Sequence, residues 1–298
     1  RRATAVARRG GRPMSARVLD LPPGTRSPSH VLSKTGAALL IDRSPRHAYL
    51  RKAGQWREEP TKAMEMGTIV HAILLGKSAQ SIEVVTGVKA WNTKVAKEKK
   101  AEIIAAGGLP ILESKANFAQ RAAERIRRRM IEEGYRLTGV SELAIEWTEE
   151  ADNGDEVTCW GALDHWLPAD GMSTIIDLKI VDNAHPRACE RSVKSLGGLI
   201  QAAAYTSAIA KLYPETEGRT RFVFLFCEVG TGEPTPIVLG GELRRLGELQ
   251  WQRAVNEWAH GQRTGEWPGY APRGPIVLEA KPWDLEEEMA LSQGDTDE

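Results

Sequence analysis

The clearest pattern of hydrophobic and polar positions along the chain is a pair of apolar, β-branched and aromatic runs within residues 159–180. A segment that contains Pro, Asp and Gly, 168–171, separates the two runs, so the stretch predicts a β-hairpin. Successive side chains of a strand point to opposite faces, which puts Asp177 and Lys179 together on one face of the second strand. Asp164 lies near the end of the first strand, and the hairpin is expected to bring its carboxylate close to that of Asp177.

Other parts of the chain show the two-residue period of strands or the 3.6-residue period of helices. Because strands and helices follow one another along the chain, the pattern predicts an α/β fold with a mixed central β-sheet flanked by helices. Ser33 is expected to cap the first helix, and Ser44-Pro45 to end it and start another. The strands are expected at 81–88, 141–148, 221–229 and 234–239, and the helices at 34–42, 61–75, 93–106, 114–133, 197–213 and 241–259.

Charge divides the chain into a central domain, residues 27–275, and two extensions. Residues 1–26 hold seven arginines against one acid, Asp20, and are predicted to form a flexible basic extension. Such a segment is typical of an organelle transit peptide or of an arm that binds nucleic acid, but we favour a simpler interpretation, in which translation begins at Met14. Residues 276–298 are predicted to form a disordered acidic tail, because their last part carries seven acids and no base.

The overall charge of the chain gives no sign of a nucleic-acid-binding protein. Its 298 residues include 40 basic and 40 acidic side chains, so any contact with DNA has to come from a local patch. The helix predicted over 114–133 offers five candidate cations for phosphate contacts, although a solvated helix face explains them equally well. These are Arg121, Arg125, Arg127, Arg128 and Arg129.

The three cysteines, Cys159, Cys189 and Cys227, are odd in number and widely spaced. This favours neither a disulfide framework nor a zinc site, and it disfavours an iron–sulfur cluster, which needs four ligands. A cytoplasmic protein is expected, because cysteines stay reduced there. No apolar run approaches the roughly 20 residues of a membrane span, so the protein is expected to be soluble.

Asp164, Asp177 and Lys179 form a set suited to phosphodiester hydrolysis. That reaction uses a hard cation held by carboxylate oxygens, which polarises the phosphate and lowers the pKa of a bound water. A nearby ammonium then stabilises the developing charge. The pattern D-x-K by itself is more typical of an ordinary hairpin with a solvated Asp and Lys, so the interpretation depends on the rest of the chain.

Further candidate chemistry lies on three other elements. His71 follows Gly67 by one helical turn and is either a metal ligand or a phosphate contact, although a lone helical histidine is more often packed or solvated. Glu142 lies on the strand before the hairpin and is a candidate metal ligand or a partner of one. Gln201 and Tyr205, four residues apart, share one face of an alanine-rich helix.

Taken together, these motifs resemble the PD-(D/E)XK nuclease superfamily, and more closely the phage-type exonucleases of the RecE (exonuclease VIII) and lambda-exonuclease group. Five pieces occur in the family's order over roughly residues 33–270, and the combination is far more specific than any one piece. The pieces are G-T-I-V-H (67–71), S-E-L-A-I-E-W (141–147), G-A-L-D (161–164), D-L-K (177–179) and Q-A-A-A-Y (201–205).

The resemblance implies a restriction-endonuclease-like core and a metal-dependent exodeoxyribonuclease. Such an enzyme degrades one strand of linear double-stranded DNA from its end, 5′ to 3′, in phage-type recombination, with Mg²⁺ as the cofactor and Mn²⁺ as a substitute. The resemblance further implies a ring-shaped homo-oligomer around the DNA and a single-strand annealing protein as partner. No membrane is involved.

The resemblance also assigns roles to individual residues. Two carboxylates and a backbone carbonyl would hold the metal, further side chains would complete its ligand set, a lysine would position the attacking water, and a Gln–Tyr pair would orient the site. The implied metal ligands are His71, Glu142, Asp164, Asp177 and the carbonyl of Leu178, and the implied catalytic residues are Asp164, Asp177, Lys179, Gln201 and Tyr205.

Three alternatives remain open at this point. The same core also occurs in endonucleases and in nucleases specific for single strands. A catalytically inactive protein that binds DNA or inhibits a nuclease is a second alternative, but the intact set of two acids and a lysine argues against it. A purely structural α/β protein would leave His71, Gln201 and Tyr205 unexplained.

Overall fold

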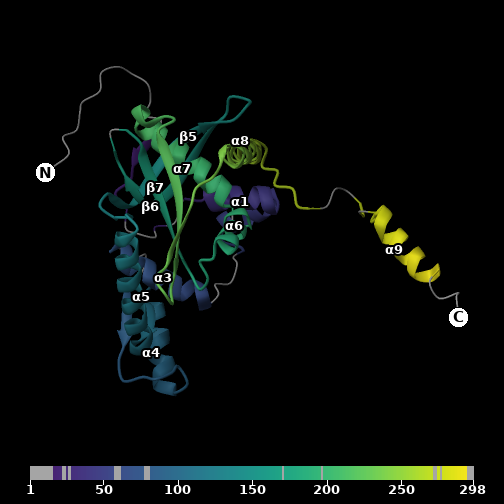
Figure 1. The fold of residues 1–298 in the computed structure, drawn as a ribbon. Helices are drawn as coiled ribbons and strands as arrows, with labels where there is room; N and C mark the ends of the chain where they lie inside the picture. The colour runs from purple at the N-terminus through teal and green to yellow at the C-terminus, as the bar shows by residue number, and fades with distance from the viewer. Residues whose placement is uncertain are drawn as a thin grey trace.

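The central feature of the protein is a mixed β-sheet with helices on both faces (Figure 1). The computed structural model describes residues 16–21, 25, 28–56, 62–76, 81–169, 171–195, 197–270, 274–275 and 277–293. The sheet is built from β1 (Ala16–Val18), β2 (Leu32–Ser33), β5 (Val140–Glu150), β6 (Glu156–Leu167), β7 (Ser173–Val181), β8 (Thr220–Glu228) and β9 (Pro234–Ile237). A separate pair consists of β3 (Ile82–Val85) and β4 (Leu109–Leu112).

Seven helices of the described residues lie close to where the sequence predicted them, whereas no helix was predicted at Pro186–Ser195 or Pro282–Gln293. Ser33 caps the first helix as expected, since its hydroxyl accepts a hydrogen bond from the backbone N–H of Gly36 at 3.3 Å. A 3₁₀ turn, Pro214–Thr216, precedes β8. The helices are α1 (Lys34–Asp42), α2 (Pro45–Lys52), α3 (Lys62–Leu75), α4 (Lys94–Ala105), α5 (Glu113–Glu132), α6 (Pro186–Ser195), α7 (Gly198–Leu212), α8 (Gly241–Thr264) and α9 (Pro282–Gln293).

The strand order confirms the predicted α/β class with a mixed sheet. The order is β1-β5-β6-β7-β8-β9, and β2 pairs with β6. Only the β7–β8 and β2–β6 pairs are parallel, while the other pairs of this sheet are antiparallel. None of the helices in the described part of the chain is long and apolar enough to cross a membrane.

Two hydrophobic cores cover the two faces of the sheet, and β7 contributes to both. Ile175 belongs to the core shared with α1, α7 and α8, whereas Ile176 and Leu178 belong to the core shared with α3 and α5. This is the alternation that the sequence predicted for the strand. The polar pair Asp177 and Lys179 therefore lies on the face covered by α7.

A buried carboxylate fixes α7 and α8 to the sheet. Glu149 of β5 is only 8% exposed, and its Oε1 accepts hydrogen bonds from Trp147 Nε1, Ser207 Oγ and Trp251 Nε1 at 2.9, 2.7 and 3.1 Å. Its Oε2 lies 3.1 Å from Lys211 Nζ. A buried acid is tolerated when it is paired and fully hydrogen-bonded, and this one joins three elements. It thereby sets the position of the helix that carries Gln201 and Tyr205.

The ladder between β6 and β7 stops at the two aspartates. The last paired residues are His165 and Ile176, so the next level would place Asp164 opposite Asp177. Beyond it β6 pairs with β2 at Cys159 and Trp160 and no longer with β7. The strands therefore diverge at the aspartates, and α1 starts beside the opening because it follows β2 directly.

Both extensions contain regular structure that the sequence analysis did not expect. Ala16–Val18 of the N-terminal extension forms β1, an edge strand on β5. The acidic tail contains α9, which Figure 1 shows set apart from the sheet and its helices. Residues 1–15, with most of the arginines of the extension, lie outside the described residues.

The contact between α7 and α8 yields a test of the fold. A Cβ atom on Gly247 of α8 would lie 2.4 Å from the backbone oxygen of Leu199 in α7. Gly→Ala in a helix interior normally stabilises by about 1 kcal/mol, but overpacking costs about 1–3 kcal/mol. We expect Gly247→Ala to lower the free energy of unfolding, measured by urea denaturation. Gly241→Ala in the same helix, where a Cβ meets nothing within 4 Å, should leave stability equal or higher.

Candidate active site

Three potential metal ligands converge from three elements at the point where the strands diverge. His71 of α3, Glu142 of β5 and Asp164 of β6 each offer one ligand atom, and these atoms all lie within 4.8 Å of one another. His71 Nε2 is 3.1 Å from Asp164 Oδ2, and His71 Nδ1 is 3.9 Å from Glu142 Oε1. The structure thus brings together three of the five predicted ligands.

Glu142 reaches this cluster through an unusual backbone conformation. Its φ of 52° makes it the one residue other than glycine with a positive φ among the residues that the structure describes. The β5–β6 ladder pairs Ser141 with His165 and Leu143 with Leu163 but passes over Glu142 and Asp164. Such a conformation costs about 1–3 kcal/mol in a non-glycine residue and is concentrated at functional sites. The strain turns the Glu142 carboxylate toward His71.

Asp164 takes over the hydrogen bond that the diverging strand loses. Its Oδ2 accepts from the backbone N–H of Leu178 at 2.8 Å. This contact satisfies a donor that no longer has a strand partner, and it fixes the carboxylate between the two strands. The prediction that the Leu178 carbonyl binds metal stays a prediction.

Asp177 belongs to a second polar group beside the first. Its Oδ1 accepts a hydrogen bond from Gln201 Nε2, and its Oδ2 lies 2.7 Å from Lys179 Nζ. Gln201 Oε1 in turn accepts from Lys34 Nζ at 2.9 Å. The carboxylate is 2% exposed and is not one of the three clustered ligands, so its predicted role as a metal ligand stays a prediction.

Tyr205 supports β6 one turn of α7 beyond Gln201. A Cβ atom on Gly161 would lie 2.4 Å from Tyr205 Cε1, so the aromatic ring occupies the space that the glycine leaves. Burial raises the pKa of Tyr205, and the charges of Asp164 and Asp177 raise it further. The phenol therefore stays neutral and holds the strand just before Asp164.

Opposite charges act against burial on the pKa values of three groups of the site. Burial disfavours the imidazolium of His71, but the hydrogen bond and charge of Asp164, with Glu142, hold its pKa above the usual value. The pKa of Asp164 is lowered, because the contacts with His71 and the charge of Lys179 outweigh its burial. For Lys179 too, burial is outweighed by Asp177 and Asp164, and its pKa is raised. Lys179 is thus a permanent cation and not a general base.

A pocket of about 520 Å³ lies beside β6, next to the site. Its wall includes the start of α1 and three cations, Lys34, Arg51 and Lys52. Burial lowers the pKa of Lys52 to about 8, and the charge of Arg51 contributes. The aromatic side chains of Trp160 and Tyr205 also line it. Cations and aromatic rings of this kind suit a nucleic-acid strand.

Sequence reasoning missed Lys34. The chain showed that Ser33 begins a helix, but nothing in its spacing showed that this helix starts at the opening between β6 and β7. The resemblance over roughly residues 33–270 was the available signal, because it placed Ser33 and Ser44-Pro45 within the domain.

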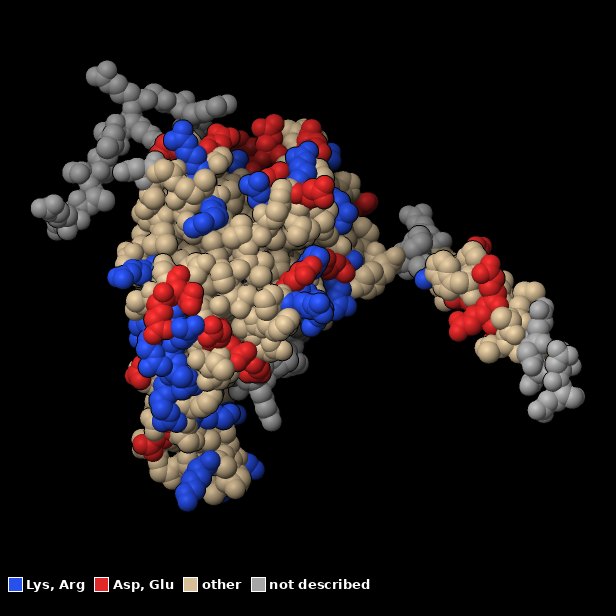
Figure 2. Space-filling model, in the orientation of Figure 1, with Lys and Arg blue, Asp and Glu red and all other residues tan. Residues whose placement is uncertain are grey.

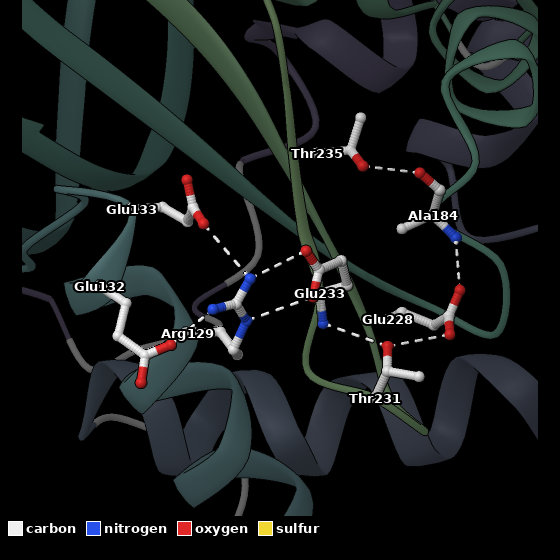
Figure 3. Close-up of polar contacts among 8 residues, drawn as sticks. All are labelled: Arg129, Glu132, Glu133, Ala184, Glu228, Thr231, Glu233 and Thr235. Atoms are coloured by element: carbon white, nitrogen blue, oxygen red, sulfur yellow. Dashed lines mark hydrogen bonds and ion pairs between the residues drawn. The ribbon is translucent and has the colours of Figure 1, made fainter.

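Three of the five α5 arginines already contact other parts of the protein, and the predicted role of all five as phosphate contacts stays a prediction. Arg129 contacts Glu132, Glu133 and Glu233, as Figure 3 shows. Arg125 and Arg127 donate to backbone carbonyls, those of Val229 and Ile73, at 3.1 and 3.2 Å. On the face shown in Figure 2, basic side chains gather over the α5 region with acidic side chains among them. Packing of α5 against α3 and the turn between β8 and β9 brings these partners within reach.

The clustered donors fit a divalent cation. Carboxylate oxygens suit Mg²⁺ and Mn²⁺, and an imidazole nitrogen adds a preference for the softer of the two. Among the described residues this is the one group of at least three His, Cys, Asp or Glu side chains placed to hold an ion. The ligand set does not by itself identify the metal.

Comparisons with known proteins agree with this fold. A family model described as "PDDEXK-like domain of unknown function (DUF3799)" matches residues 37–269. A crystal structure of a protein from Eubacterium rectale, named a "putative exonuclease", is similar with a TM-score of 0.54 and 16% sequence identity. The match covers 86% of this chain and 93% of that chain, and at this identity it shows the fold alone. No curated protein matches the sequence.

Glu142, the acid with the strained backbone, is the most informative residue to change in a test of metal binding. Glu142→Gln keeps the side-chain shape but removes the charge, so affinity for Mn²⁺ in calorimetric titration should fall by about tenfold or more. Glu146→Gln is the matched control, because Glu146 lies on the same strand and pairs with Arg17 at the surface. If both variants bind Mn²⁺ like the unmodified protein, Glu142 is not a ligand.

Proposed function

The chain belongs to the family of PDDEXK-like domains (DUF3799), and from this membership we propose that it is a metal-dependent nuclease that hydrolyses phosphodiester bonds of DNA. The observation that carries the proposal is the cluster of His71, Glu142 and Asp164 directly beside the Asp177–Lys179 pair. Three acids, an imidazole and a lysine on four different elements are not needed to stabilise a hairpin.

Each group of the site has a separate task in this proposal. A divalent cation held by His71, Glu142 and Asp164 supplies electrophilic assistance to the phosphate and lowers the pKa of a water molecule. Lys179 keeps a fixed positive charge next to the reacting phosphate, where it stabilises the charge that develops. Asp177 holds that ammonium in place at 2.7 Å. Gln201 and Tyr205 fix Asp177 and the strand that carries Asp164.

The finer proposal is an exonuclease that degrades linear double-stranded DNA 5′ to 3′ with Mg²⁺. It is supported by the order of the five motifs, which resembles that of the RecE and lambda-exonuclease group, and by the printed name of the protein from Eubacterium rectale. A ring-shaped homo-oligomer and a single-strand annealing protein as partner belong to the same proposal. They rest on the resemblance alone.

The phosphate contacts in this proposal come from the pocket beside β6 and not from α5. Arg51 and Lys52 line that pocket next to the site, and Lys52 Nζ also donates to the Pro28 carbonyl at 3.2 Å. Arg125, Arg127 and Arg129 lie on α5 and contact Val229, Ile73 and Glu233. With a net charge of +0, the chain depends on such local cations to bind DNA.

The proposed role of Lys179 predicts a large loss of rate. Lys179→Ala should lower the single-turnover rate of DNA cleavage by about a hundredfold or more, while DNA and Mn²⁺ affinities change little, because the ammonium acts mainly on the transition state. Lys194→Ala is the matched control, because Lys194 is also paired with an acid, Glu190, but lies on the exposed face of α6. Its cleavage rate should equal that of the unmodified protein. Unchanged cleavage by Lys179→Ala would contradict the assignment.

The proposed substrate predicts a distinct pattern of digestion. Linear duplex DNA should be shortened progressively with Mg²⁺ or Mn²⁺, and both chelation by EDTA and Asp164→Asn should stop the reaction. Covalently closed circles should stay intact, which agarose electrophoresis shows directly. Nicking of closed circles as fast as linear ends are shortened would replace the exonuclease by an endonuclease on the same core.

A further inference from the structure

Lys34 connects the first turn of α1 to the catalytic strand through a single side chain. It is the first residue of the helix that Ser33 caps. Its ammonium donates to Gln201 Oε1 at 2.9 Å, and Gln201 Nε2 donates to Asp177 Oδ1. The helix start and the strand that carries Asp177 are thus joined by two successive hydrogen bonds.

The chemistry of the ammonium, the amide and the carboxylate fixes the direction of these two hydrogen bonds. An ammonium only donates hydrogen bonds, so Lys34 selects the oxygen of the Gln201 amide. The amide nitrogen is then left to face the carboxylate of Asp177, which only accepts. A reversed amide would place its oxygen against Asp177 and its nitrogen against Lys34, and both contacts would be repulsive. Lys34 and Asp177 therefore favour the same orientation of the Gln201 amide, and Lys34 holds its oxygen end.

Lys34 is costly for stability in its present place. It makes no ion pair within 4.0 Å in the part of the chain that the structure describes, and its one hydrogen bond is the bond to a neutral amide. Burial lowers its pKa, and the nearby charge of Lys179 lowers it further. Asp177 and Asp164 act in the opposite direction, but a partly buried ammonium whose one hydrogen bond goes to a neutral amide is held less favourably than one paired directly with an acid. Stability alone does not explain this lysine.

We propose that Lys34 is a positioning residue for the nuclease reaction: it orients the amide of Gln201, which holds Asp177 so that its other oxygen faces Lys179. This inference rests on the proposed nuclease function. The resulting series of polar contacts links Lys34 of α1 to Gln201 of α7, and Gln201 to Asp177 and Lys179 of β7. Removing Lys34 takes away one of the two contacts that orient the amide, so Asp177 and the ammonium of Lys179 are held less firmly.

A double-mutant cycle tests whether Lys34 acts through Gln201. Lys34→Met and Gln201→Met should each lower kcat for DNA cleavage by about tenfold or more with little change in KM. The double variant should be no slower than Gln201→Met, because the two residues act as one unit. Independent losses that multiply, or a raised KM with unchanged kcat, would show instead that Lys34 contacts the DNA, and would overturn the proposal.

Lys94→Met is a matched control for these variants. Lys94 is also the first residue of a helix behind a capping side chain, Thr93, but it is 90% exposed and pairs only with Glu98. The Lys94→Met variant should have the kcat and KM of the unmodified protein. Lys34→Arg retains charge and donors, so it should recover part of the kcat that Lys34→Met loses. No recovery by Lys34→Arg, with the protein folded, counts against a role through hydrogen bonding.

A second readout separates this inference from the proposed function. The side-chain amide protons of Gln201, followed by ¹H–¹⁵N NMR without metal or DNA, should have distinct shifts that Lys34→Met moves toward those of a free glutamine. Lys34→Arg should keep them near their original positions. If the unmodified protein cuts no DNA, the proposed function fails, but these spectra still test the orientation of Gln201. An unchanged Gln201 signal in folded Lys34→Met refutes the inference.

Discussion

The divergence of β6 from β7 is the constraint on which the site depends. Two antiparallel strands cannot separate inside a sheet without leaving backbone groups unpaired, and Asp164 resolves this by accepting the N–H of Leu178. The same carboxylate is thereby fixed within reach of His71. A structural requirement of the sheet and a chemical requirement of the site are met by one side chain.

The opening between the strands lets both faces of the sheet contribute to one site. His71 arrives on α3 from the face with the core of Ile176 and Leu178, whereas Gln201 arrives on α7 from the other face. In a continuous sheet these side chains would be separated by backbone. The buried Glu149 and the close approach of Gly247 to α7 hold α7 at the distance from the sheet that the Gln201–Asp177 contact needs.

Crowding of acids gives the site its electrostatic character. Glu142, Asp164 and Asp177 lie close together, and the strain at Glu142 shows that packing alone does not favour this arrangement. Three basic side chains, those of His71, Lys34 and Lys179, offset part of the repulsion between the acids. The acids in turn raise the pKa of His71 and of Lys179. The charges are in place before any substrate binds, which is the arrangement that electrostatic catalysis requires.

The sequence by itself determined the secondary structure around the site and most of the candidate residues in it. Alternation placed Asp177 and Lys179 on one face of β7, and helical spacing placed Gln201 and Tyr205 on one face of α7, because both depend only on local geometry. Tertiary structure alone decided that Lys34 joins this group, that Asp177 bonds Gln201 while Asp164 faces His71, and that the α5 arginines contact their own protein. These outcomes depend on where β6 leaves β7 and on how the helices pack, and neither is encoded in the spacing of residues along one element.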